Sequence, residues 1–112
     1  DQQIDENFAF DILEAEVIVN RHVQGPLSQS MFDACTSFVF NIGPGRKGVK
    51  DGFVTLKSGS PSTFLRQLNA RAYLAAANEI PKWNKAGGVV VNGLTIRRGL
   101  ERTLFLRDPF PV

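Results

Sequence analysis

The stretch FDACTSFVFNIG, residues 32–43, decides the fold of this chain. Apolar side chains recur through it and just before it at spacings of three and four residues, which predicts a helix buried along one stripe. The stripe is formed by Met31, Cys35, Phe38 and Ile42, with Phe32 and Val39 at its edges. Ser28 is a suitable N-cap, and Gly43 ends the pattern. We therefore expect a long helix between Ser28 and Gly43.

The segments on either side also predict helices, separated by glycine and proline. The first helix would bury Ile4, Phe8, Ile12, Ala15 and Val19. A short helix is expected to begin at Ser60-Pro61 and to end at Asn69. The next would start near Arg71 and end or kink at Pro81. Its buried face is expected to consist of Tyr73, Ala76, Ala77 and Ile80. The last helix is marked by Ile96, Leu100 and Leu104.

Between the helices, residues 43–59 have no helical period and are rich in glycine, lysine and arginine, so we expect an exposed loop. Within this loop, GFVTL at residues 52–56 can form a short strand. Residues 89–91 can extend briefly, and Asn92-Gly93 is a turn signal. With 112 residues and 43% hydrophobic content, the chain is predicted to form one all-α domain over residues 1–112.

The charge and the cysteine content narrow the possible functions. The formal net charge of +2 attracts an anionic polymer only weakly. The densest basic group, Arg97, Arg98 and Arg102, is interrupted by Glu101. This interruption favours a solvated, salt-bridged helix face over a nucleic-acid patch. Cys35 is the only cysteine, so an intramolecular disulfide is impossible and a buried structural thiol is expected.

The sequence supplies no candidate catalytic or metal-binding group. His22 is the only histidine, so neither a metal site nor a histidine-dependent triad can be assembled, and we expect no cofactor. Glycoside hydrolysis ordinarily needs two carboxyl groups in different environments. Asp11, Glu14 and Glu16 have instead the pattern of solvated carboxylates on the surface of the first helix.

Two aromatic residues are candidates for ligand contact. Phe40 lies opposite the buried stripe of its helix, beside Asp33, Thr36 and Ser37, on a face that is otherwise polar. It forms either a second packing surface or a platform for a sugar ring. Trp83 has the same two interpretations, because an indole suits both a corner of the core and the face of a saccharide.

Three stretches together resemble the C-terminal lobe of the phage-type lysozymes, the endolysin muramidases. They are FDACTSFVFNIG at residues 32–43, LRQLNARAYLAAANEIPKWNKAGG at 65–88 and RRGLERTLFL at 97–106. The resemblance implies a compact, multi-helix lobe of a lysozyme-like fold that binds peptidoglycan glycan strands. It also implies a structural role for Trp83. The loop at residues 43–59 departs from the family pattern, because it is longer than the tight connection usual between those helices. The substrate contacts that it implies are Phe40, Asn41, Thr63, Asn78, Asn84 and Lys85.

The same resemblance implies that the family's catalytic Glu lies in an N-terminal region that would precede Asp1. The parent protein is then expected to hydrolyse the β-1,4 bond between N-acetylmuramic acid and N-acetylglucosamine in the host cell wall, while this segment alone is inactive. A non-catalytic wall-binding or protein-interaction module derived from a lysozyme is the alternative, and a nucleic-acid binder would rest only on the last helix. The sequence shows no membrane-spanning stretch, and its start, DQQIDENF, lacks the features of a signal peptide.

Overall fold

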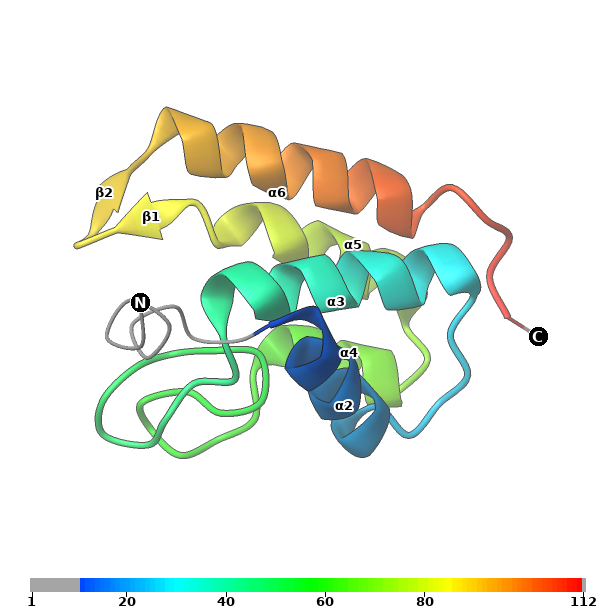
Figure 1. Cartoon of the computed structure of the whole chain (residues 1–112), viewed down its shortest axis with the longest axis horizontal. Helices are drawn as coiled ribbons and strands as arrows, with labels where there is room; N and C mark the ends of the chain where they lie inside the picture. The colour runs from blue at the N-terminus through cyan, green and yellow to red at the C-terminus, as the bar shows by residue number, and fades with distance from the viewer. Residues whose placement is uncertain (1–10, 112) are drawn as a thin grey trace.

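In the computed structural model, which describes residues 11–111, the helix α3 (Gln29–Ile42) occupies the middle of the fold. Figure 1 shows α6 (Asn92–Phe105) running alongside α3, with α2 (Ile12–His22) on the other side of that helix. The helices α4 (Thr63–Asn69) and α5 (Tyr73–Glu79) pack against each other. Among the described helices, none combines the length and the apolar character that crossing a bilayer requires.

The central helix matches its prediction. The Ser28 side chain caps α3 by accepting a hydrogen bond from the Met31 backbone N–H at 3.2 Å, and Gly43, with φ 89°, ends the helix. Cys35 and Phe38 are fully buried in the core. Thr36 is also buried, so its prediction as part of a polar face is wrong. The reason is that α3 packs against helices on two sides and therefore buries more than one stripe.

The helix α2 begins with a capping box, in which the Asp11 side chain accepts from the Glu14 N–H while the Glu14 side chain accepts from Asp11. Ala15 and Val19 are buried as predicted. Ile12 remains 49% exposed, so its predicted burial is wrong, and the apolar face is covered only from the second turn onward. Ile4 and Phe8, predicted on the same face, lie outside the described residues.

Residues 43–59 form the predicted loop, but two features of it differ from the prediction. The expected strand at 52–56 reduces to one bridge between Thr55 and Pro61, and Phe53 is fully buried in the core. The predicted cap at Ser60 is also wrong. Because the backbone at Pro61 pairs with Thr55, the helix α4 starts two residues later, and its cap is Ser62. The Ser62 hydroxyl accepts from Leu65 at 3.0 Å and donates to the Phe53 carbonyl at 2.5 Å.

The helix α5 buries the predicted face, and the 3-10 helix η1 (Ile80–Lys82) follows it at the proline. The chain then forms an antiparallel hairpin of β1 (Lys85–Ala86) and β2 (Val89–Val90). The fold is therefore mostly helical with a small sheet, and the prediction of an all-α domain needs this correction. Asn92 and Gly93, predicted as a turn, open α6 instead, because the turn of the hairpin lies at Gly87 and Gly88, both with positive φ.

Of the three apolar residues that mark α6 in the sequence, only Leu104 packs against the core. Ile96 and Leu100 are 56% and 68% exposed, whereas Arg98, Glu101 and Phe105 are buried. The spacing of apolar residues did not identify this face, because two of its buried positions, Arg98 and Glu101, carry opposite charges that pair with each other. The loop at residues 43–59 and the β1–β2 hairpin both lie near the C-terminal end of α3, one on each side of it (Figure 1).

Candidate functional site

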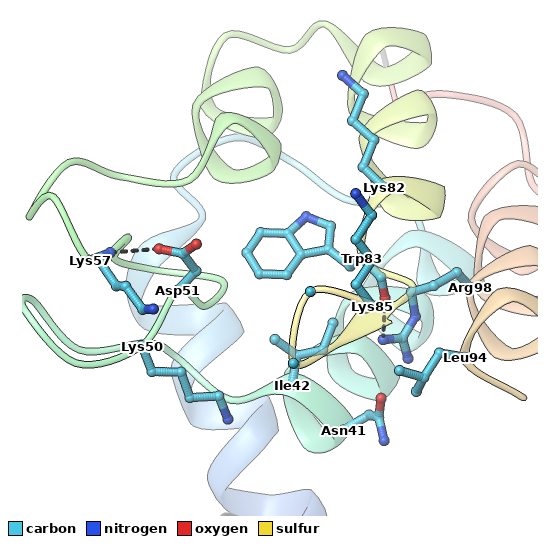
Figure 2. Close-up of a pocket in the computed structure, with 12 residues that line it drawn as sticks. Asn41, Ile42, Lys50, Asp51, Lys57, Lys82, Trp83, Lys85, Leu94 and Arg98 are labelled. Carbon is cyan, nitrogen blue, oxygen red and sulfur yellow. Dashed lines mark hydrogen bonds between the residues drawn. The ribbon is translucent and has the colours of Figure 1, made fainter. Parts of the chain in front are cut away.

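An open pocket of about 630 Å³ lies at the C-terminal end of α3 (Figure 2). Its walls come from the end of α3, the loop at residues 43–59, η1, the hairpin and the first turns of α6. We call it the lysine pocket. It is lined by Asn41, Ile42, Lys50, Asp51, Lys57, Lys82, Trp83, Lys85, Gly87, Gly88, Leu94 and Arg98.

Trp83 connects this pocket to the core. Its indole meets the Phe38 ring edge to face, with the ring centroids 5.4 Å apart, while part of the same indole stays exposed. The Trp83 backbone N–H donates to the Ile80 carbonyl at 3.1 Å, which closes η1. Its carbonyl accepts from Arg98 at 3.4 Å. Trp83 therefore packs against the core, as one of its two interpretations predicts, and it also lines the pocket, while saccharide contact stays a prediction.

Beneath the pocket, Arg98 and Glu101 form a buried ion pair, so the predicted solvated face is wrong for these two residues. Arg98 Nε lies 2.7 Å from Glu101 Oε1, and Arg98 Nη2 donates to Oε2 at 3.0 Å. The Ser37 hydroxyl also donates to Oε2, at 2.6 Å. Burial lowers the pKa of the Arg98 guanidinium, and the Glu101 carboxylate opposes this effect. The Arg98 guanidinium carbon also lies 5.4 Å from the centroid of the Phe38 ring.

The loop wall of the pocket is held by close backbone contacts. A Cβ added at Gly52 would lie 2.0 Å from the Gly45 nitrogen, so no side chain fits there. The Phe53 N–H donates to the Gly43 carbonyl at 3.0 Å, while its ring packs into the core. The Asp51 carboxylate accepts from the Lys57 backbone N–H at 2.7 Å. These contacts give the exposed lysines of the loop a defined backbone.

The structure brings two of the predicted substrate contacts, Asn41 and Lys85, to the lysine pocket. Phe40 precedes Asn41 on α3 and is 39% exposed, but it does not line the pocket. The other three contribute to hydrogen bonds elsewhere on the surface. Thr63 accepts from Arg66, Asn78 accepts from Arg102, and Asn84 donates to Thr95.

Sequence reasoning missed most of the positive charge in the pocket. Lys50 and Lys57 come from the loop, and Lys82 comes from η1. In the sequence these residues look like ordinary solvated lysines, since the loop has no periodicity that shows where its side chains point. The one available signal was the lysine on each side of Trp83, in PKWNK at residues 81–85.

The comparisons with known proteins agree with this fold. The family model described as phage lysozyme matches residues 1–101. The endolysin of Bacillus phage B103 is 46% identical over 96 residues, which cover 86% of this chain and 32% of that protein. The endolysin of Salmonella phage P22 is 40% identical over 96 residues, covering 86% of this chain and 57% of that protein.

Solved structures give the same result. The muramidase domain of SpmX from Asticaccaulis excentricus has a TM-score of 0.68 and 34% identity, covering 89% of this chain and 62% of that one. The active form of the P1 phage endolysin Lyz also has a TM-score of 0.68, with 27% identity, covering 86% and 54%. This chain spans about a third to three fifths of the relatives that it matches. On the family match and these two likenesses, the chain belongs to the phage lysozyme family and has a lysozyme-like fold.

Proposed function

We propose that this chain is the C-terminal, glycan-binding lobe of an endolysin that acts on the host bacterial cell wall. The parent protein would hydrolyse the β-1,4 bond between N-acetylmuramic acid and N-acetylglucosamine in peptidoglycan. The observation that carries the proposal is the lysine pocket, whose lining includes both the partly exposed Trp83 and the exposed Asn41 (Figure 2). An aromatic face and an amide are groups that suit the apolar face and the hydroxyl or N-acetyl groups of a sugar.

In this proposal the catalytic acid comes from outside these 112 residues. Asp51 is the one acidic residue among those that line the pocket in the described part of the chain, and it accepts a backbone hydrogen bond. Glycosidases of the usual kind use two carboxyl groups, one of them held protonated. A single exposed carboxylate does not meet this requirement. We therefore propose that the segment binds and positions glycan but is inactive alone.

The predicted substrate contacts differ in how directly they would touch the glycan. Asn41 and Lys85 would touch the glycan in the pocket itself. Phe40, exposed on the last turn of α3, would extend the binding surface along that helix. Thr63, Asn78 and Asn84 stay candidates for the rim.

Binding is tested by sedimenting the chain with insoluble peptidoglycan and measuring the bound fraction. We expect the chain to pellet with the wall and Asn41→Ala to bind less. The matched control is Asn20→Ala, an exposed asparagine on α2 that is outside the lysine pocket. Equal binding by the two variants would contradict the proposed contact, and a chain that stays in the supernatant would contradict glycan binding as a whole.

Catalysis is tested separately by incubating pure protein with peptidoglycan and assaying for new reducing ends. We expect none, and turnover above a heat-inactivated control would refute the inactivity of the segment. A second assay joins this chain to the part of the P22 endolysin outside the matched segment. Wall cleavage by that fusion is expected of a catalytic lobe, whereas a non-catalytic wall-binding module would leave the fusion inactive.

A further inference from the structure

The lysines of this chain are concentrated in one place. Four of its five lysines line the lysine pocket, although they come from three separate elements. Lys50 and Lys57 project from the loop, Lys82 from η1 and Lys85 from β1, and Figure 2 shows them around the indole of Trp83. In a chain with a formal net charge of only +2, the lysines are thus gathered around this hollow.

Most of this charge lacks a counterion within residues 11–111. Lys82 Nζ lies 2.7 Å from a Glu79 carboxylate oxygen, so its charge is compensated. In that described part of the chain, no carboxylate lies within 4.0 Å of the ammonium groups of Lys50, Lys57 or Lys85.

The arginine beneath the pocket adds no further attraction, because Glu101 neutralises it. Arg98 is buried, and its Nε lies 2.7 Å from Glu101 Oε1. Among the described residues that line the hollow, the positive charge therefore belongs to the lysines, and Asp51 is the one carboxylate that opposes it. Like charges that line one concavity repel each other, and a concave wall also focuses their field on a ligand inside it. Entry of an anion reduces the repulsion between these charges and so stabilises the site.

We propose that the lysine pocket binds an anionic group, a carboxylate or a phosphate, that is carried on the glycan strand. The adjoining sugar ring would lie against Trp83. This inference rests on the proposed function and adds a determinant of specificity to it: walls whose strands carry accessible anionic groups are bound more tightly than neutral glycan.

The distribution of charge favours a substituted glycan over a nucleic acid. A nucleic-acid site needs cations that follow a repeating phosphate backbone, commonly with several aromatic residues for stacking. Here the lysines enclose a single hollow with one indole. Among the arginines of α6, Arg98 binds Glu101 and Arg102 donates to Asn78 at 2.8 Å.

The test measures binding of the 112-residue chain to insoluble peptidoglycan by sedimentation over a range of protein concentrations. The pocket variant is Lys50→Gln/Lys85→Gln, which removes one cation from each side of the hollow. The control variant, Arg21→Gln/Lys47→Gln, removes the same charge from exposed positions outside the pocket. We expect the Kd of the pocket variant to rise roughly fivefold, as for the loss of two exposed ion pairs, and that of the control to rise less than about twofold.

Two treatments of the wall identify the anion. Amidation removes carboxylates, and aqueous hydrofluoric acid removes phosphodiester-linked polymers. We expect one treatment to weaken the wild type to the level of the pocket variant while leaving that variant unchanged. If neither treatment affects the wild type, or if both double variants bind equally well, the inference fails while the proposed function stands.

Uncharged chitooligosaccharide and a mixed-sequence oligonucleotide complete the test. Binding of the sugar that is equal in the wild type and the pocket variant supports a role for the lysines in reading the anionic group. Absence of binding to every glycan material would overturn the proposed function and this inference together. Tighter binding to the oligonucleotide than to peptidoglycan would overturn the assignment of the pocket to the wall.

Discussion

Replacing Phe38 or Phe40 by alanine tests whether these two residues lie on a buried and an exposed face of α3. The Phe38 ring is fully buried and meets Phe64 at 5.0 Å and Trp83 at 5.4 Å between centroids, both edge to face. Phe40, two residues later, keeps 39% of its surface exposed. The same chemical change at neighbouring positions therefore removes a core ring in one case and a surface ring in the other.

The expected costs follow from this difference in burial. Phe38→Ala should destabilise the fold by about 3 to 5 kcal/mol, because it leaves a cavity in the core and removes the aromatic contacts. Phe40→Ala loses the burial of about three fifths of a ring, and its site is open to solvent, so about 1 to 2 kcal/mol is expected. At about 4 °C per kcal/mol for a chain of this size, the losses in Tm would be about 12 to 20 °C and about 4 to 8 °C.

Thermal unfolding followed by circular dichroism measures both losses, and Trp83 gives a second readout because it is the only tryptophan. Phe38→Ala should shift the fluorescence of Trp83, since it removes the ring that packs against the indole, and Phe40→Ala should not. Phe38→Leu is the control that keeps an apolar side chain at the buried site. If Phe40→Ala costs as much stability as Phe38→Ala, Phe40 belongs to the core, and its proposed place on the binding surface must be abandoned.

Three further predictions concern polar groups that are buried or held by hydrogen bonds. The thiol of Cys35, whose pKa is raised by burial, should react with a bulky aromatic disulfide only after denaturation, so rapid labelling of the native protein would contradict its placement. Glu101→Gln should cost about 3 to 5 kcal/mol in chemical denaturation because it leaves a buried guanidinium without its counterion. The half-exposed Arg97→Gln should cost below about 1 kcal/mol, and equal losses would exclude a buried pair. The backbone N–H of Ser30, followed by its hydroxyl, lowers the pKa of Asp108. The contribution of Asp108 to stability should therefore be complete at a pH above its unfolded-state pKa of about 3.9. It should vanish as the pH falls through its lower folded-state pKa. A stability gap between the wild type and Asp108→Asn that does not narrow in acid would refute this.

The sequence predicted best those helices whose apolar stripe lies within the buried face. In α3 and α5 the apolar stripe packs into the core, so spacing alone located Phe38 and Ala76 there, although α3 also buries Thr36 on a second side. In α6 the same method did not identify the buried face, because Arg98 and Glu101 are buried as a pair while Leu100 is exposed. A charge is predicted to be solvated unless its partner is known, and that partner is visible only when the helix is packed.

The site was harder to predict than the fold because it is assembled from distant parts of the chain. The resemblance led to Asn41 and Lys85, which lie in recognisable motifs. It gave no indication of Lys50 and Lys57, since these lie in a loop without periodicity whose path is set by backbone contacts. Phe53 was missed for the same reason: one buried ring in a glycine-rich loop has no period to identify it.

The pocket has a floor formed by Trp83 and its contacts and a rim formed by the lysines. Substitutions in the floor and in the rim should affect the stability of the fold differently. The floor is part of the core, because Trp83 packs on Phe38 and its carbonyl is held by Arg98, which is in turn held by Glu101. Substitutions there should therefore change stability and binding together. The rim lysines project from exposed positions, so replacing them should alter binding with little effect on the free energy of unfolding. If the proposed function holds, specificity for different cell walls would change through the rim, while the aromatic surface proposed to receive the sugar would be kept in place by the same contacts that hold α3 and α6 together.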